Sequence, residues 1–323
     1  MVESKNQSCL IGEGSYSAHI PDGFTRLYEP DLFQLPDHLR LQADGDWKSF
    51  YLLDQSTLSV VGEIHFYLND RVAVSPGRAP FASFMLDEAI TEEQLDDFIQ
   101  HAEEQLTSIN ISSMVLKNPS ACLHPYVVLL EKVLVNRGYR IVTEETSAII
   151  PVDQQLLHQK MSHGKRYHLH QTHKHGLLVD FIGLQQLPAI YAFLSRCRSA
   201  KGYMLSMSLE DLLSLAEVFP DRILLTVVRS MEHMVAASIS VLVSSELLYT
   251  LYYDHDAAHD SISPVGLLIS ELYTWSRQRG IGNIDLGTSN PDGLLKPSLL
   301  QFKTELGAVA YPKRTFEKKL QAR

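Results

Sequence analysis

The segment Leu247-Leu-Tyr-Thr-Leu-Tyr-Tyr-Asp-His-Asp256, followed after a short loop by Ser263-Pro-Val-Gly-Leu-Leu268, decides the fold of this chain. Its first part is rich in aromatic and apolar residues and predicts a strand. Ser263 and Pro264 are residue types typical of an N-cap and of the first position of a helix. Apolar residues at helical spacing continue this helix to about Gly280. A strand that leads through a loop into a helix is a unit of an α/β fold.

The rest of the chain predicts two similar series of strands and helices. In the first half we expect strands over residues 50–53, 58–65, 71–74, 81–86, 113–116 and 140–150, and helices over 91–106 and 125–137. Thr91 and Gln94 form the capping box of the first of these helices. In the second half we expect strands over 177–182, 223–228, 234–243, 247–253, 283–286 and 308–317, and helices over 187–198, 208–219, 264–280 and 296–306.

The chain length fits two domains. It has 323 residues, and a domain commonly takes about 150. We therefore predict an α/β protein (α+β by some schemes) with a domain over 1–150, a basic histidine-rich connector over 151–176, and a second domain over 177–323 that carries the presumed site. The two halves are predicted to repeat the order of their strands and helices only, because no residue pattern recurs between them.

Composition excludes several classes of protein. The chain is 45% hydrophobic and 20% charged, too apolar for a disordered protein. No uncharged apolar run is long enough to span a membrane, and residues 1–19 contain no apolar core of a signal peptide. The cysteines (Cys9, Cys122 and Cys197) lie far apart and form neither a metal pattern nor a disulfide framework, which predicts a reducing, cytoplasmic location.

Charge is distributed unevenly along the chain. The net charge of −10 argues against a general polyanion binder, but residues 79–116 contain no lysine or arginine and residues 154–179 contain no acid. The second segment holds six histidines together with Lys160, Lys165, Arg166 and Lys174. Because it has no carboxylate or thiolate beside its histidines, we expect no metal site there. A solvated basic linker that meets an anionic ligand fits this composition better.

Three local patterns could carry chemistry. The helix that starts at Ser263 has Gly266 in its first turn, so its N-terminus could hold a phosphate or carboxylate, or could be an ordinary capped end. Asp285 and Ser289 fall at the carboxyl end of a strand, where ligands bind in open α/β sheets, although Asp285 could instead satisfy backbone groups. Lys303 lies on a helix and could face this crevice or solvent.

Three stretches, in this order, resemble the FemAB-type branch of the GNAT acyltransferase superfamily. They are the basic run 162–176, the tyrosine-rich strand and helix from Tyr249 to Gly280, and Asp285-Leu-Gly287 followed by Phe302-Lys303 and Leu306-Gly307-Ala308. The resemblance covers about half of the chain. It implies two tandem GNAT-like domains, each a mixed, mostly antiparallel sheet flanked by helices. The first half resembles the family in layout only.

The resemblance also implies an activity: an amine attacks the carbonyl of an activated ester or thioester, so that an acyl or aminoacyl group is transferred. Lys303 would stabilise the oxyanion or a substrate phosphate, and Tyr253 or Asp254 would relay protons, with Asp285 as a further catalytic candidate. Donor-binding residues would be Ser263, Val265, Gly266, Leu267 and Ser289. Substrate-binding residues would be Lys165, Arg166, Tyr252 and Phe302, although the strand register decides which of the two tyrosines faces the crevice.

The donor remains open at this point. Typical acetyl-CoA enzymes carry a glycine-rich loop before this helix, whereas residues 258–266 contain Asp260, which would repel a pyrophosphate, and a single glycine. FemAB-type members share this departure, and many use aminoacyl-tRNA. We expect no tightly bound cofactor, with acyl-CoA as one candidate co-substrate and a small molecule or cell-wall precursor as acceptor.

Two alternatives stay beside the acyl-CoA hypothesis. One is an aminoacyl-tRNA-dependent transferase acting on a cell-wall precursor. The sequence shows no long basic face that would bind tRNA, which argues against this alternative. The other is a degenerate acyltransferase fold that serves as a binding or scaffold protein. If Lys303, Asp285 and Tyr253 converge on one cavity, the enzyme hypotheses gain over the scaffold hypothesis. The sequence does not determine the oligomeric state.

Overall fold

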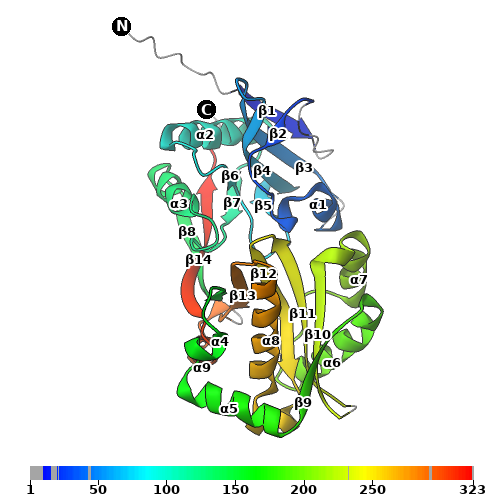
Figure 1. Ribbon diagram of the computed structural model, residues 1–323. Helices are drawn as coiled ribbons and strands as arrows, with labels where there is room; N and C mark the ends of the chain where they lie inside the picture. The colour runs from blue at the N-terminus through cyan, green and yellow to red at the C-terminus, as the bar shows by residue number, and fades with distance from the viewer. Residues whose placement is uncertain are drawn as a thin grey trace. The chain divides into compact units, whose positions relative to one another are not determined.

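The computed structural model describes residues 10–15, 20, 22–42, 45–231, 233–290 and 293–321, and for residues 10–15 and 173 it describes the backbone alone. Cys9 and most of the region considered for a signal peptide lie outside the described residues. The chain forms two compact units. Figure 1 shows the chain coloured from blue at its N-terminus to red at its C-terminus. Unit 1 consists of Met1–Glu144 together with Pro312–Arg323, and unit 2 consists of Glu145–Tyr311.

Unit 1 is a helix-covered sheet. Its strands are β1 (Leu10–Ser15), β2 (Thr25–Arg26), β3 (Trp47–Asp54), β4 (Ser59–Asn69), β5 (Val72–Ser75), β6 (Met85–Leu86) and β7 (Ser113–Lys117), joined by the first part of β8 (Arg140–Pro151) and most of β14 (Val309–Lys319). Its helices are η1 (Leu32–Gln34), α1 (Pro36–Gln42), α2 (Glu92–Ser108) and α3 (Val127–Asn136).

The sheet of unit 1 has the order β1-β3-β4-β5-β7-β14-β8. From β1 to β14, neighbours pair antiparallel except for β5 and β7, which are parallel. Helix α2 begins with the capping box predicted from Thr91 and Gln94, and its apolar face (Leu95, Phe98, Ile99, Ala102 and Leu106) is fully buried in the core. At roughly 25 cal/mol for each Å² of apolar surface buried, this face contributes a large share of the stability of unit 1.

Unit 2 contains the remaining elements. Its strands are the second part of β8, β9 (Leu177–Ile182), β10 (Ile223–Ser230), β11 (His233–Ser244), β12 (Leu247–His255) and β13 (Asn283–Thr288). Its helices are α4 (Leu157–Lys160), α5 (His163–Lys174), η2 (Leu184–Gln186), α6 (Leu187–Ser199), α7 (Leu209–Val218), η3 (Pro220–Arg222), η4 (Ala257–Ile262), α8 (Pro264–Gln278) and α9 (Pro297–Glu305).

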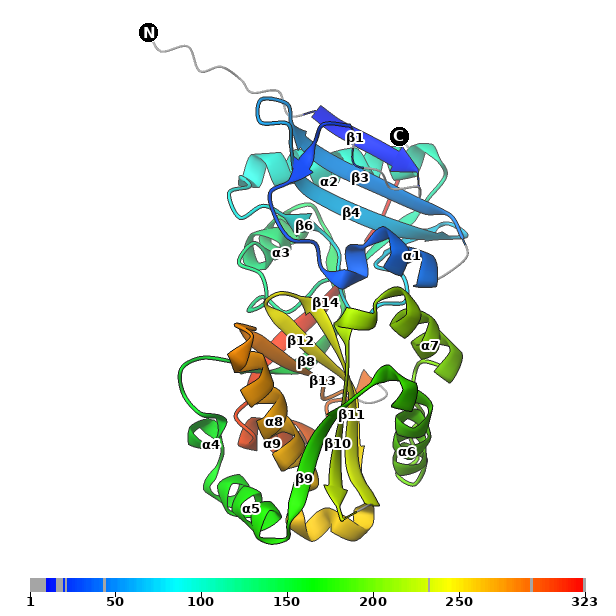
Figure 2. The same cartoon turned by 45° about the vertical axis from the view of Figure 1, so that its right-hand side comes forward.

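The sheet of unit 2 has the order β8-β13-β12-β11-β10-β9, and only β12 and β13 are parallel. Helices cover both faces: α8 packs on one face, and α6 and α7 pack on the other (Figure 2). Each unit is thus a mixed, mostly antiparallel sheet flanked by helices, which confirms the predicted fold class. Among the described residues, no helix is both long and apolar enough to cross a membrane.

The local structure departs from the sequence analysis at three places. The expected strand over residues 81–86 is reduced to Met85–Leu86, because Ser83 has a left-handed backbone with φ of 87°. The expected connector 151–176 is largely helical and forms α4 and α5 within unit 2. Strand β1 and helix α1 were not predicted, because they are short elements without a long periodic pattern.

The last strand also departs from the predicted domain limits. Residues 315–319 of β14 pair with β7 in unit 1 rather than with a strand of the C-terminal half. Conversely, β8 begins in unit 1 and pairs with β13 of unit 2 from Ser147 onward. Both strands therefore pass from one unit into the other, which a boundary placed at a single residue does not describe.

Candidate active site

Strands β12 and β13 of unit 2 pair briefly and then separate. Their parallel ladder contains three residue pairs, from Leu247 with Asn283 to Tyr249 with Asp285, although β12 continues to His255. A cavity of about 520 Å³ lies where the strands separate. It is lined by side chains from these strands and by residues of α6, α8 and α9 with their flanking loops, among them Arg198, Lys201, Tyr252, Tyr253, Asp254, Val265, Lys296, Phe302 and Lys303.

Lys303 lies in the last turn of α9 and is 2% exposed. Its Nζ donates hydrogen bonds to the carbonyl oxygens of Gly287 (2.8 Å) and Thr288 (2.7 Å), which fix the ammonium group at the end of β13. Burial lowers the pKa of Lys303 from 10.5 to about 8, while the nearby Asp285 carboxylate opposes this shift. An ammonium has three donors, and no described residue accepts the third. Lys303 can therefore direct a positive charge at a ligand in the cavity.

Asp285 is buried in β13 and organises the turn beside Lys303. Its Oδ1 accepts a 2.7 Å hydrogen bond from the backbone N–H of Gly287, whose φ of 74° is readily adopted only by glycine. Asp285 does not itself line the cavity, whereas the next three residues, Leu286 to Thr288, do. Its position fits the alternative in which it satisfies backbone groups, and its charge favours the protonated form of Lys303.

The strand register of β12 separates its two neighbouring tyrosines. The hydroxyl of Tyr253 donates to the carbonyl of Leu286 at 3.3 Å, and burial raises the pKa of Tyr253, so its phenol stays protonated at neutral pH. The hydroxyl of Tyr252 lies 2.6 Å from Ser206 Oγ and accepts from the N–H of Met207 at 2.9 Å. Tyr253 thus bridges the two separating strands, and Tyr252 ties β12 to the loop after α6.

Asp254 is part of an ion-pair cluster. Its Oδ1 accepts from Lys201 Nζ at 2.5 Å, and its Oδ2 lies 3.4 Å from Arg198 Nε. Both of these cations line the cavity, as does Lys296, whose Nζ donates to the hydroxyl of Tyr203 at 3.2 Å. None of these three cations was predicted from the sequence, since a basic residue at a helix end or in a loop carries no distinctive spacing. Because these cations and Lys303 line the cavity against the single carboxylate of Asp254, the cavity favours an anionic ligand.

The predicted donor-binding residues are only partly brought together. Val265, at the start of α8, lines the cavity, whereas Ser263, Gly266, Leu267 and Ser289 are not among its lining residues. Ser263 was expected to cap α8 through its side chain. It occupies the N-cap position, but with a left-handed backbone (φ of 48°) and without a side-chain cap hydrogen bond.

The predicted basic pair on α5 lies beside the lining residues. Lys165 Nζ sits 4.3 Å from the ring centroid of Phe302, a cation–π distance, and 3.8 Å from Glu305 Oε2. Arg166 is exposed and donates to the carbonyl of Met161 at 3.0 Å. Only Lys165 therefore contacts a residue of the cavity wall. Within the described part of the chain, no three histidine, cysteine or acidic side chains are grouped as metal ligands.

The fold was compared with known proteins. It is similar to the crystal structure of FemX, with a TM-score of 0.70 over 90% of this chain and 92% of that chain, at 13% sequence identity. It is also similar to L-PGS from Bacillus licheniformis, with a TM-score of 0.56 over 88% of this chain and 87% of that chain, at 15% identity. No protein-family model and no curated protein sequence matches the chain. At these identities the similarity shows the fold alone, and at that level the resemblance to FemAB-type proteins is confirmed.

Proposed function

We propose that this protein is an N-acyltransferase that moves an acyl or aminoacyl group from an activated donor to an amine acceptor in the cavity of unit 2. The observation that carries the proposal is Lys303, a buried ammonium that donates to two carbonyls and, among the described residues, has no acceptor for its third N–H, at the point where β12 and β13 separate. Lys303 and Tyr253 line one cavity and Asp285 does not, so two of the three residues on which the enzyme hypotheses depend converge.

In this proposal the amine attacks the carbonyl carbon of the donor, a C–N bond forms, and the C–S or C–O bond of the donor breaks. Lys303 in its protonated form stabilises the negative charge that develops on the carbonyl oxygen, or a phosphate of the substrate. The attacking amine loses one proton and the leaving group gains one. Tyr253, which remains protonated at neutral pH, would relay a proton from the amine to the leaving group, and Asp254, which Lys201 and Arg198 contact, is the alternative relay.

We infer that the donor or the acceptor carries phosphate. Arg198, Lys201, Lys296 and Lys303 all line the cavity, against the single carboxylate of Asp254. Acyl-CoA, aminoacyl-tRNA and nucleotide-linked cell-wall precursors all present phosphate groups. The fold similarity to FemX over most of both chains favours the aminoacyl-tRNA-dependent reaction as the second candidate.

A binding and transfer experiment tests the proposal. The purified protein would be screened by thermal shift with acetyl-CoA, long-chain acyl-CoA, charged tRNA and a UDP-linked cell-wall precursor, and then assayed for transfer with the ligands that stabilise it. We expect stabilisation by one donor class, and transfer that Lys303→Ala abolishes without loss of folding. Binding without transfer for every donor and acceptor pair would favour a scaffold protein. Normal transfer by Lys303→Ala would overturn the role of this lysine.

A further inference from the structure

The first five residues of β8 form an exposed edge of unit 1. Strand β14 lies between β7 and β8, and β13 pairs with β8 only from Ser147 to Pro151. Residues 140–144 are all exposed, including Ile141 (48%) and Val142 (51%). Among the described strands, none pairs with the outer side of this segment. An unpaired strand edge with apolar side chains is a template for pairing with another strand.

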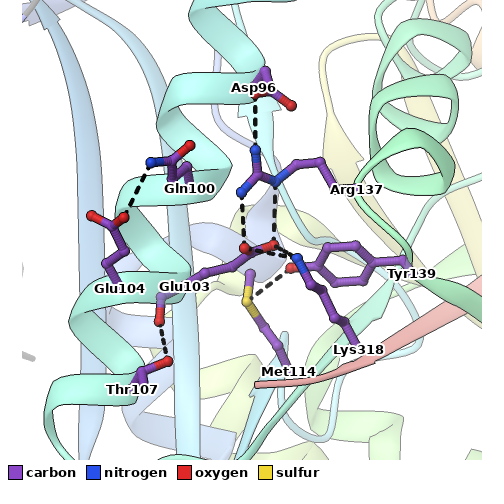
Figure 3. A network of polar contacts seen from close by, with 9 residues as sticks. All are labelled: Asp96, Gln100, Glu103, Glu104, Thr107, Met114, Arg137, Tyr139 and Lys318. Carbon is purple, nitrogen blue, oxygen red and sulfur yellow. Dashed lines mark hydrogen bonds and ion pairs between the residues drawn. The ribbon is translucent and has the colours of Figure 1, made fainter. Parts of the chain in front are cut away.

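A network of polar contacts holds this edge in place (Figure 3). Arg137, just before β8, donates to Asp96 Oδ2 and Glu103 Oε2 of α2 at 2.9 Å each. Lys318 of β14 donates to both oxygens of Glu103 at 2.8 Å, and the hydroxyl of Tyr139 donates to Met114 Sδ of β7 at 3.1 Å. The start of β8 is therefore fixed to α2, β7 and β14, so little conformational entropy would be lost when a second strand pairs with it.

The direction of the outward backbone groups follows from Thr146. Its N–H donates to Asn290 Oδ1, and its carbonyl accepts from the N–H of Ser289, so both groups point toward the β13 side of β8. Backbone groups alternate along a strand, and the N–H and C=O of Glu144, Val142 and Arg140 therefore point to the same, unpaired side. Their side chains share one face, since side chains also alternate. Arg140 and Val142 line a groove of about 1260 Å³ on that face.

We propose that a second copy of this chain pairs with this edge, β8 against β8, in an antiparallel two-fold dimer. With Val142 opposite Val142 of the partner subunit, Arg140 lies opposite Glu144 of the partner subunit at both ends. All the outward groups of these residues then form hydrogen-bonded pairs. Glu144 contacts Arg314 of its own chain through Oε2 at 2.8 Å, and its side chain is 54% exposed, so it can also face the partner's arginine.

Charge complementarity specifies this register and this occupant. A shift of two residues would place Arg140 opposite an apolar or uncharged residue of the partner subunit. A shift of one residue would place backbone groups that face the interface opposite groups of the partner subunit that point away from it, so the hydrogen bonds could not form. The sequence Arg140-Ile-Val-Thr-Glu144 is thus complementary to its own antiparallel copy. A short interface of this kind predicts a weak, concentration-dependent dimer.

Sedimentation velocity from about 1 µM to about 1 mM protein tests the proposal. The wild type is expected to shift from monomer to dimer. Arg140→Glu and Glu144→Arg would each oppose like charges and raise the dimer dissociation constant by about tenfold or more. An equimolar mixture of the two variants, and the double variant, would recover dimerisation. Lys319→Glu and Glu104→Arg are matched controls, because they make the same charge changes in the same groove but lie outside the strand edge. Both should leave dimerisation unchanged.

Circular dichroism and thermal unfolding would establish that each variant is folded before its assembly is measured. A wild type that stays monomeric over the whole range would overturn the proposal. So would single variants that dimerise as well as the wild type, or a mixture that fails to recover the dimer. In the last case Arg140 and Glu144 would support dimerisation without facing one another across the interface.

Discussion

The buried ammonium of Lys303 predicts a specific pH dependence of stability for unit 2. Its pKa is about 8 in the folded protein, against 10.5 for an ordinary lysine. Below pH 8 both the folded and the unfolded chain carry the proton, and the folded state bears the cost of a buried charge. Between these two pKa values the unfolded state keeps a proton that the folded state has released. Stability therefore rises with pH through this window and is greatest, as far as Lys303 is concerned, above 10.5.

The size of the effect follows from the same two values. A shift of one pKa unit corresponds to about 1.4 kcal/mol, so the full difference for Lys303 is about 3 kcal/mol. Roughly 2 kcal/mol of this falls between pH 7 and pH 10. Replacing Lys303 by Met keeps much of the side-chain volume but removes the titrating group. From pH 7 to pH 10, the free energy of unfolding of the wild type should therefore rise by about 2 kcal/mol more than that of the Lys303→Met variant.

The assay is urea unfolding of both proteins at several pH values, followed by tryptophan fluorescence. Trp275 lies on α8 of unit 2, and Trp47 lies on β3 of unit 1, so a Trp47→Phe background reports on unit 2 alone. Burial raises the pKa of Tyr249 and of Tyr253, but both proteins retain these tyrosines, and their contribution cancels in the difference. A difference between the two proteins that is constant from pH 7 to pH 10 would refute the reasoning.

Four further changes test other parts of the structure. Lys303→Ala should lower kcat of the transfer reaction by about 100-fold or more in steady-state kinetics. Tyr252→Phe removes contacts to Ser206 and Met207 and should destabilise the protein by about 1–2 kcal/mol in urea unfolding, with no effect if these contacts are absent in solution. Arg137→Met leaves Glu103 with Lys318 as its remaining cation and should cost about 2 kcal/mol by the same measurement. Thr91→Ala removes the capping box of α2 and should lower the free energy of unfolding by about 1 kcal/mol, whereas an unchanged midpoint would count against the cap.

Local chemistry explains which helices were predictable. The capping box at Thr91 and the proline at position 264 each act within a few residues, and α2 and α8 begin where these signals predict. The left-handed backbone of Ser263 was not predictable, because it depends on how η4 leads into α8 rather than on the serine itself. Helix α5 was missed because its histidine-rich sequence has no apolar face with a strong period, and its contacts with α8 and β9 come from the tertiary structure.

The candidate site likewise contains residues that were predictable from the sequence and residues that were not. Lys303, Tyr253 and Phe302 line the cavity as the resemblance implied, since their positions follow from the order of strand and helix. Arg198 and Lys201 lie about fifty residues earlier in the chain and reach Asp254 only after α6 packs against β12. Interactions between such distant segments leave no mark in local spacing. The roles of the individual residues in transfer stay predictions until the variants are assayed.

The exchange of β8 and β14 between the two units has a consequence for biosynthesis. A ribosome releases the chain from its N-terminus, and most domains begin to fold as soon as they emerge. Unit 1 cannot complete its sheet at that stage, because β14, which lies between β7 and β8, consists of residues 309–319. Met114 and Leu116 of β7 must wait for Phe316 and its neighbours to arrive. The part of the protein that is synthesised first is therefore among the last to be finished.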